Sequence, residues 1–319
     1  MKKIILPAVA SLLMGLSALA AAQAYPNKPV RVIVPTVPGP LDAFARAVLE
    51  KVTDRVKQPF VIENRPGAGG NVGAEVVAKA APDGYAILFA IDTTFTVNPS
   101  IYKKMPFDPV KDFVTISVPV TYSQLLAVNS GVKANSVAEL VALAKQRKLS
   151  YATGGNGSPS HLTMAAFLAT AGIEMTHIPY KGTGQSVIDV VGGQVDSIFA
   201  VVTGILPQVK AGKLRALAVS SQQRSPQAPE VATIAESGYP GFNATFSFAV
   251  MAPAGTSQDI VRLLNGEIIA ALALPEVQEK NRSWDFVPTG LSPQQSATWI
   301  AETRAKWAGV ISRAGIAIE

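Results

Sequence analysis

Short apolar runs alternate with amphipathic segments along most of the chain. The first run, residues 30–34, reads Val-Arg-Val-Ile-Val and precedes a loop that contains Pro and Gly. Strand-like runs that alternate with helical periods are typical of βαβ units and a mostly parallel sheet. We therefore predict an α/β fold. Its strands are expected at residues 30–34, 59–62, 86–90, 125–128, 175–178, 195–199 and 214–219.

Helical periods and helix-start motifs place four helices with the most support. Apolar residues recur at intervals of three and four over residues 41–56 and 257–272, and Pro275 is expected to end the second of these helices. The Ser-x-x-Glu and Ser-x-x-Gln motifs at residues 136–139 and 292–295 have the pattern of capping boxes, in which side chains satisfy the first N–H groups of a helix. Both motifs therefore predict helix N-termini.

The length and composition of the chain favour two lobes. The 319 residues are 48% hydrophobic and 16% charged, and a domain holds roughly 100–200 residues. No long linker divides the sequence, so we expect two crossing segments, near residues 121–122 and 243–247. Residues 25–122 and 246–319 would then form the first lobe and residues 123–245 the second, with the ligand cleft between them.

The first 24 residues have the pattern of a secretory signal peptide. Lys2 and Lys3 precede the apolar stretch 4–19, and small residues at 22 and 24 supply a cleavage site. We predict cleavage after Ala24 and export to the periplasm; a retained membrane anchor is the alternative. The sequence has no cysteine, which excludes disulfides and thiolate metal sites.

Charge and histidine content argue against several classes of function. The formal net charge is +6, without the clustered Lys/Arg stripe of a nucleic-acid-binding protein. The two histidines, His161 and His177, do not belong to an acidic cluster at metal-ligand spacing, so we predict no metal site. A hydrolase that uses Ser158 or Ser160 with His161 is the catalytic alternative, although neighbours on one loop lack a positioned third group. We expect His161 to pack or hydrogen-bond beneath its loop and His177 to lie in the core or at a lobe edge.

Three loops rich in Gly, Pro, Ser or Thr join predicted strands to predicted helices, at residues 35–42, 153–161 and 181–186. The first N–H groups of a helix lack internal partners and carry the positive end of the helix dipole, so such loops are candidate anion sites. Ordinary strand-to-helix connections are the alternative for any one loop. The glycines of residues 67–73 have the spacing G-x-G-x-x-x-G instead of the dinucleotide spacing G-x-G-x-x-G, and we interpret them as a turn before a helix.

Seven collinear motifs resemble those of one protein family. They are Tyr25-Pro26-x-Lys28-Pro29-Val30-Arg31, Glu63-Asn64-Arg65-Pro66-Gly67-Ala68-Gly69-Gly70, Pro82-Asp83-Gly84-Tyr85, Asn98-Pro99-x-x-Tyr102, His177-Ile178-Pro179-Tyr180-Lys181-Gly182, Gly212-Lys213-Leu214-Arg215-Ala216-Leu217-Ala218-Val219 and Ala252-Pro253-Ala254-Gly255-Thr256. Together they resemble the Bug-type extracytoplasmic solute receptors of the tripartite tricarboxylate transporters. The resemblance covers residues 25–319.

The resemblance implies a two-lobed periplasmic binding protein of the type II arrangement, which captures a small carboxylated solute in the interlobe cleft. It implies no catalysis and no cofactor. The solute would pass to a membrane permease of one large and one small subunit, and a monomer is sufficient for such a cleft. A periplasmic sensor that hands its liganded form to a signalling protein is the alternative, and the sequence does not separate the two roles.

The resemblance also implies a set of ligand contacts. In this family, backbone N–H groups, hydroxyls and ordered waters hold the ligand carboxylate. Carried onto this chain, the contacts fall on Pro38, Gly39, Asp42, Asp92, Thr93, Thr153, Gly155, Asn156, Ser158, Thr183 and Gly184, and at the position of Ala200.

Three residues depart from the family's usual pattern. Pro40 replaces a second glycine, Ala200 stands where an Asp often follows a strand, and Ser247 stands where a Trp is usual. Loss of the Asp removes a partner for a ligand amine, and loss of the Trp frees volume. We therefore predict an amine-free carboxylate, either a di- or tricarboxylate or an aromatic one, in preference to an amino acid.

Overall fold

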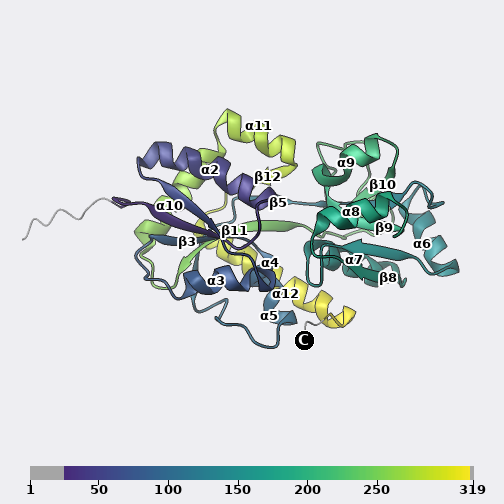
Figure 1. Cartoon of the computed structure of the whole chain (residues 1–319), viewed down its shortest axis with the longest axis horizontal. Helices are drawn as coiled ribbons and strands as arrows, with labels where there is room; N and C mark the ends of the chain where they lie inside the picture. The colour runs from purple at the N-terminus through teal and green to yellow at the C-terminus, as the bar shows by residue number, and fades with distance from the viewer. Residues whose placement is uncertain (1–24, 317–319) are drawn as a thin grey trace, which may run out of the picture.

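The computed structural model describes residues 25–316, which form two masses that lie side by side, each built on one β-sheet with helices packed against it (Figure 1). The predicted signal peptide, residues 1–24, lies outside the described residues. Within residues 25–316, each helix is too short or too polar to span a bilayer.

The first sheet has seven strands in the order β12-β5-β11-β3-β1-β2, and β4 pairs with β11. β1 pairs in parallel with β2 and β3, whereas β11 runs antiparallel to β3, β4 and β5. The strands are β1 (Val30–Val34), β2 (Phe60–Asn64), β3 (Ala86–Ile91), β4 (Phe113–Ser117), β5 (Val120–Tyr122), β11 (Phe246–Pro253) and β12 (Phe286–Pro288).

The second sheet has five strands in the order β10-β6-β9-β7-β8. β7 pairs in parallel with β8 and β9, whereas β6 runs antiparallel to β9 and β10. The strands are β6 (Gln124–Asn129), β7 (Ser150–Thr153), β8 (Thr176–Pro179), β9 (Ser197–Val201) and β10 (Leu214–Val219).

In each sheet, three strands are parallel to one another, and one strand that enters from the other sheet runs antiparallel to its neighbours. This confirms the predicted α/β fold in two lobes, each built on one sheet. The prediction of a mostly parallel sheet is wrong, because the arriving strands β6 and β11 each pair antiparallel on both sides.

The helices confirm most of the predicted starts. Ser292 forms a complete capping box with Gln295. At the other predicted box only half forms: the hydroxyl of Ser136 accepts from the Glu139 N–H, but the Glu139 carboxylate accepts from the N–H of Asn135 instead of that of Ser136. Pro275 does not end α10, which stops at Leu272; it opens α11 instead, where its missing N–H has no cost. The helices are α2 (Pro40–Val56), α3 (Asn71–Ala78), α4 (Thr93–Thr96), α5 (Asn98–Ile101), α6 (Val137–Gln146), α7 (Pro159–Ala171), α8 (Thr183–Val191), α9 (Val202–Lys210), α10 (Gln258–Leu272), α11 (Pro275–Trp284) and α12 (Pro293–Ala314), with a 3-10 turn η2 (Ala68–Gly70).

The two segments that cross between the sheets are bonded to each other. Ser123 alone separates β5 from β6, and residues 220–245 separate β10 from β11. Ser220 joins the two crossings, because its N–H donates to Gln124 O at 2.8 Å and its hydroxyl donates to Ala244 O at 2.7 Å. The long helix α12 also packs against both masses, since it contacts β4 and α4 on one side and α7 on the other (Figure 1).

Candidate interlobe ligand site

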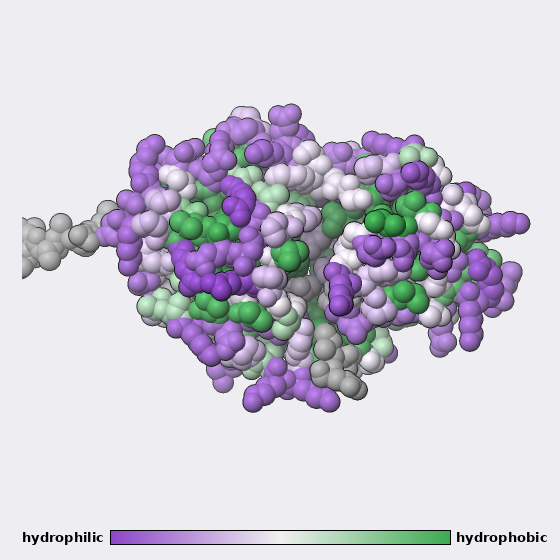
Figure 2. All heavy atoms as spheres, viewed as in Figure 1, coloured by the Kyte–Doolittle hydropathy of each residue, from purple (hydrophilic) through white to green (hydrophobic). Residues whose placement is uncertain are grey.

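A pocket of about 330 Å³ lies where loops from the two sheets meet, and Figure 2 shows the molecule hollowed between its two masses. Its lining residues are uncharged. They are Pro35, Thr36, Gly67, Ala68, Gly69, Gly70, Ile91, Thr93, Thr94, Asn98, Ile101 and Tyr102 from the first sheet's side, and Gly154, Asn156, Gly157, Ser158 and Pro159 from the second.

The pocket lies at the carboxyl ends of parallel strands. Residues 35–36 follow β1, residues 67–70 follow β2, and Thr93 and Thr94 follow β3, while residues 154–159 follow β7 of the other sheet. Ligands of open α/β sheets bind outside the carboxyl ends of the strands, at the crevice where the connections diverge. The topology therefore brings four separate strand-to-helix connections to one place.

The turn at residues 67–70, which we call the glycine turn, forms much of the first wall. Asn98 Nδ2 donates to Gly69 O at 3.0 Å, which fixes the turn against α5. Gly70 has φ of +97°, and a Cβ there would lie 2.5 Å from Thr94 Oγ1. A Cβ on Gly73 would lie 2.7 Å from Pro35 Cβ. These close approaches explain why residues 70 and 73 are glycines.

A buried carboxyl group supports the first wall from behind. Asp92 is fully buried at the start of α4, and its Oδ2 accepts from the N–H and the hydroxyl of Ser247 at 3.0 and 2.8 Å, whereas Oδ1 has no hydrogen-bond partner. Burial raises the pKa of Asp92 to about 7, against the opposing effects of the Ser247 hydrogen bonds and of Lys306. The indole of Trp299 donates to Ser247 Oγ at 3.2 Å. Ser247 is itself buried, so it opens no space toward the pocket.

The 153–158 loop forms the second wall, and its own side chains and carbonyls take up most of its backbone donors. Four of its N–H groups have acceptors within the chain, although the sequence argument treated such groups as available to a ligand. Ligand contacts on this wall are therefore expected mainly from the exposed Asn156, because the hydroxyl of Ser158 also donates within the loop, to Gly155 O at 2.7 Å. The acceptors are Ser160 Oγ for Gly154, Thr153 Oγ1 for Gly155, His161 Nδ1 for Gly157 and Gly155 O for Ser158.

Three stacked rings lie beneath this loop. The ring centroid of His161 lies 4.1 Å from that of His177, which in turn lies 5.0 Å from that of Tyr151. Burial, with a smaller effect of His177, lowers the pKa of His161 to about 4. The expectation that His161 hydrogen-bonds beneath its loop is confirmed. Its Nδ1 faces the Gly157 N–H, not a serine hydroxyl, and Ser158 Oγ donates to Gly155 O at 2.7 Å, which is not the geometry of a nucleophile and its base.

The predicted contact residues divide into two groups. Thr93, Asn156 and Ser158 line the pocket, and Gly155 and Thr153 belong to the same loop without lining it. Thr153 is buried and its Oγ1 lies 2.7 Å from His177 Nε2.

The remaining predicted contacts lie outside the pocket lining. Pro38 and Gly39 are exposed in front of α2, and Thr183 and Gly184 are exposed at the start of α8. Asp42 is buried and accepts from Arg46 at 2.8 Å and from Asn64 at 3.0 Å; the hydrogen bond from Arg46 lowers the pKa of Asp42. The position of Ala200 lies in the interior of the second sheet, where it pairs with Leu125 of β6.

The glycine turn, Asn98 and Tyr102 also line the pocket, although their place in it was not predicted from the sequence. The turn could have been found, because it follows the second strand of a βαβ unit and therefore reaches the same sheet edge as the loops after β1 and β3. Asn98 and Tyr102 belong to one of the seven family motifs, but the motif did not indicate a place in the pocket, since that place depends on how α5 packs against the turn.

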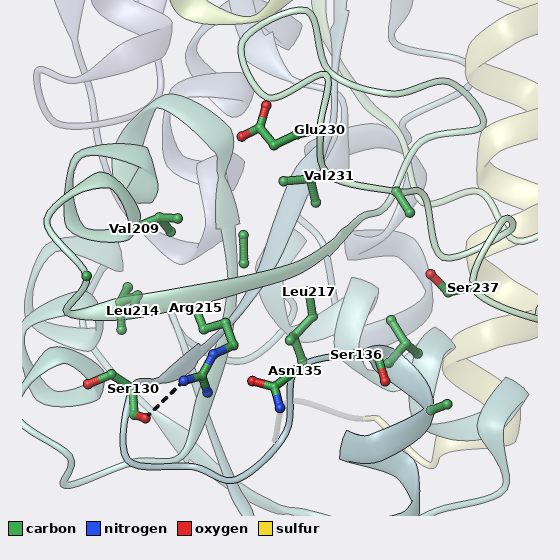
Figure 3. A pocket seen from close by; sticks show the side chains of 15 residues that line it. Ser130, Asn135, Ser136, Val209, Leu214, Arg215, Leu217, Glu230, Val231 and Ser237 are labelled. Atoms are coloured by element: carbon green, nitrogen blue, oxygen red, sulfur yellow. Dashed lines mark hydrogen bonds between the residues drawn. The ribbon is translucent and has the colours of Figure 1, made fainter.

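A second, larger groove of about 750 Å³ runs along β10 on the second sheet, away from the first (Figure 3). Arg215 lines this groove, and its guanidinium donates to the carbonyls of Ser130, Val132 and Ala134 at 3.4, 2.9 and 3.3 Å. Those donors are thus engaged with the chain itself. The smaller pocket is the better candidate, because two sheets contribute to it and its position matches the strand ends.

Metal ligation has no support in the geometry: within residues 25–316, no group of three or more His, Cys, Asp or Glu side chains is close enough to hold an ion.

Comparison with known proteins identifies the family. The family described as tripartite tricarboxylate transporter family receptor matches residues 44–316. The chain is 36% identical to protein BugT of Bordetella pertussis over 305 residues, which cover 94% of each chain.

Two solved structures are similar over the whole fold. The R. palustris protein Rpa4515 with adipate has a TM-score of 0.84 and 34% identity, and the match covers 92% of this chain and 99% of that one. MatC from Rhodopseudomonas palustris with bound malate has a TM-score of 0.79 and 28% identity, over 90% of this chain and 100% of that one. The chain therefore belongs to the receptor family of the tripartite tricarboxylate transporters, a periplasmic family of solute-binding proteins and not of enzymes.

Proposed function

We propose that this protein captures a small, amine-free carboxylate in the interlobe pocket and delivers it to the membrane permease of a tripartite tricarboxylate transporter. The observation that carries the proposal is the pocket of about 330 Å³ that both sheets line with uncharged residues. Adipate and malate, bound in the two similar structures, are dicarboxylates of a size that such a volume accommodates.

The absence of acidic residues from the pocket lining supports a ligand without an amine. A ligand ammonium group that leaves water needs a carboxylate or several acceptors to replace its hydration. The lining residues include no Asp or Glu, Asp42 is paired with Arg46, and Asp92 is fully buried behind the first wall. A carboxylate, by contrast, is satisfied by neutral donors such as Thr93, Asn156 and Tyr102.

The experiment is a thermal-shift screen of refolded protein against adipate, malate, citrate, benzoate and glutamate, followed by calorimetric titration. A ligand at 100 times its dissociation constant stabilises the folded state by about 2.7 kcal/mol, which moves the midpoint by a few degrees. We expect a shift with at least one of the amine-free acids and none with glutamate.

A matched pair of variants locates the site. Asn156→Asp changes one atom of the pocket lining and places a second negative charge beside the ligand, so we expect at least about a thirtyfold loss of affinity. Glu230→Gln changes the groove along β10 and is expected to leave affinity within about twofold. The proposal fails if no carboxylate stabilises the protein, or if the Glu230 variant loses affinity and the Asn156 variant does not.

The proposal includes three further features of the receptor. Residues 25–122 with 246–319, and residues 123–245, act as two bodies that close on the solute; the division of the strands between the two sheets supports these bounds. Cleavage after Ala24 leaves Tyr25 as the first residue, and Tyr25 is anchored, since its hydroxyl donates to Gly84 O at 2.6 Å. The receptor acts as a monomer. Small-angle scattering with and without adipate tests the closure, and mass spectrometry of the exported chain tests the cleavage.

A further inference from the structure

The second wall of the pocket is rich in glycine, and two contacts hold it in place. Residues 154, 155 and 157 are glycines, and Gly157 has φ of +71°. Glycine allows many backbone conformations, so ordering such a stretch costs more conformational entropy than ordering other residues. Asn156 and Ser158, which flank Gly157, both line the pocket. The shape of this wall therefore depends on what holds Gly157.

The imidazole of His161 holds Gly157. Its Nδ1 accepts from the Gly157 N–H at 3.2 Å, and both groups are buried. The ring lies flat against His177, with the ring centroids 4.1 Å apart and the planes 12° apart. His177 is itself fixed between His161 and Tyr151, and its Nε2 lies 2.7 Å from Thr153 Oγ1. The stack thus fixes the start of the loop as well as its middle.

This contact requires an unprotonated Nδ1. A neutral imidazole has one accepting nitrogen, whereas a protonated imidazole carries hydrogen on both nitrogens and cannot accept. His161 of α7 stacks on His177 of β8, which in turn stacks on Tyr151 of β7 and lies beside the Thr153 hydroxyl. None of these groups is an anion that would favour the imidazolium. Burial and the neighbouring His177 both lower the pKa of His161, to about 4. The accepting form therefore prevails at neutral pH.

We propose that His161 is a positioning residue for the ligand: its neutral imidazole fixes Gly157, and with it the Asn156–Ser158 part of the pocket wall, and protonation of the ring releases that part. The inference rests on the proposed function only for what occupies the pocket. A wall that is ordered before binding costs less to order in the complex, so the contact increases affinity without touching the solute.

The first test needs no ligand. The sequence has two histidines, so nitrogen spectra of protein labelled at histidine contain two rings, and the His161→Asn variant identifies which is which. We expect His161 at pH 7 as the tautomer with hydrogen on Nε2 and none on Nδ1. The amide signal of Gly157 should titrate with the same midpoint as the His161 ring, well below 6.5. A protonated Nδ1 at pH 7, or a Gly157 amide that does not follow the ring, overturns the proposal.

The second test compares two variants by calorimetric titration with adipate and malate. His161→Phe keeps a flat ring in the stack but removes the acceptor, and we expect about a tenfold loss of affinity. His161→Asn places an amide oxygen near the position of Nδ1 and should recover affinity to within about threefold of the unchanged protein. A loss in the Asn variant that equals or exceeds the loss in the Phe variant would mean that the accepting nitrogen is not what positions the wall, and no loss in either would mean that His161 does not position it; each result overturns the proposal.

The two tests separate this inference from the proposed function. If neither adipate nor malate binds the unchanged protein, the proposed function fails for these acids, and the ligand-free spectra still decide whether His161 holds Gly157. If the Phe variant does not fold, as judged by circular dichroism, the spectra of the unchanged protein and of the Asn variant remain sufficient.

Discussion

An acidic side chain is buried behind one wall of the interlobe pocket, and a basic side chain is buried beneath the other. Behind the first wall, Asp92 is fully buried and burial raises its pKa to about 7. Beneath the second wall, burial lowers the pKa of His161 to about 4. In both places burial disfavours the charged form, because a charge loses its hydration there. The comparison shows that both walls of the pocket rest on buried groups that burial holds toward neutrality, not on fixed charges.

The two groups respond to acid in opposite directions. The pKa of Asp92 is higher in the folded state than its ordinary 3.8, so its contribution to stability is complete below about pH 4 and is lost as pH rises through 7. The pKa of His161 is lower in the folded state than its ordinary 6.5, so its contribution is complete above about 6.5 and is lost as pH falls through 4. Between pH 4 and 7 the two slopes oppose each other.

The largest effect is expected from the shape of the first wall. Gly70→Ala places a Cβ 2.5 Å from Thr94 Oγ1 at a residue with φ of +97°. Backbone strain and overpacking each cost roughly 1–3 kcal/mol, so we expect a loss of about 3 kcal/mol in the free energy of unfolding and a large loss of adipate affinity. Urea denaturation measures the first and calorimetry the second.

The matched control for this variant is Gly266→Ala in α10. No atom lies within 4 Å of the position of its Cβ, and its φ is not in the positive range. This variant should gain about 0.5–1 kcal/mol, as alanine does over glycine in a helix. Similar stability of the two variants would show that the glycine turn adapts easily, and the first wall would then not be fixed by close packing.

The next effect concerns the direction in which the free energy of unfolding changes with pH. Asp92→Asn removes a carboxyl group that burial disfavours in its ionised form, while the amide oxygen can still accept from Ser247. A shift from 3.8 to about 7 sets a ceiling of roughly 4 kcal/mol. Two effects reduce the gain: the carboxylate no longer offsets the charge of Lys306, and the new amide N–H2 group occupies the buried position of Oδ1, which has no hydrogen-bond partner. We therefore expect the variant to be about 2 kcal/mol more stable than the unchanged protein at pH 8.

The difference should shrink as pH falls toward 3.8 and approach zero below that value, where Asp92 is protonated in both states. Urea denaturation at pH 4.5, 6 and 8 measures it. His161→Asn is the counterpart in the other wall, and its stability relative to the unchanged protein should rise as pH falls from 6.5 to 4. If both variants change the slope in the same direction, the two walls do not differ in the way that their buried groups indicate.

The sequence predicted the parts of the fold that show a clear local period. β1 and β10 lie at the predicted residues, and α2 and α10 begin and end within one residue of the prediction. β11 was missed because all eight of its residues are buried, so it has no alternation of apolar and polar positions. β5 and β12 were missed because three residues are too few to show a period.

The candidate site was predictable only in part, because its chemistry depends on packing between distant segments. Of the residues predicted in the 153–158 loop, Asn156 and Ser158 line the candidate pocket. The same kind of motif at residues 35–42 reaches the pocket with Pro35 and Thr36 but leaves Pro38 and Gly39 exposed. Local sequence does not show which end of a loop faces the opposite sheet, nor that the loop's N–H groups already have acceptors.

The smallest effect tests the connection between the two walls. Ser220 is fully buried between the crossing segments, where its hydroxyl accepts from Gln124 N–H at 2.9 Å and donates to Ala244 O at 2.7 Å. Ser220→Ala leaves a buried N–H without this acceptor, which costs about 1–3 kcal/mol, and we expect a loss near 1.5 kcal/mol in urea denaturation.

Ser221→Ala is the matched control, since that hydroxyl donates only to Gln223 O at the surface, and it should change stability by less than about 0.5 kcal/mol. Ser220 lines neither wall, so under the proposed closure it would alter adipate affinity by changing the balance between open and closed arrangements of the two lobes. An affinity within about threefold of the unchanged protein, together with the loss of stability, would show that the crossing segments hold the lobes together without setting that balance. A much larger change in affinity with no loss of stability would show the reverse, and the two walls would then be coupled through Ser220, not supported independently by Asp92 and His161.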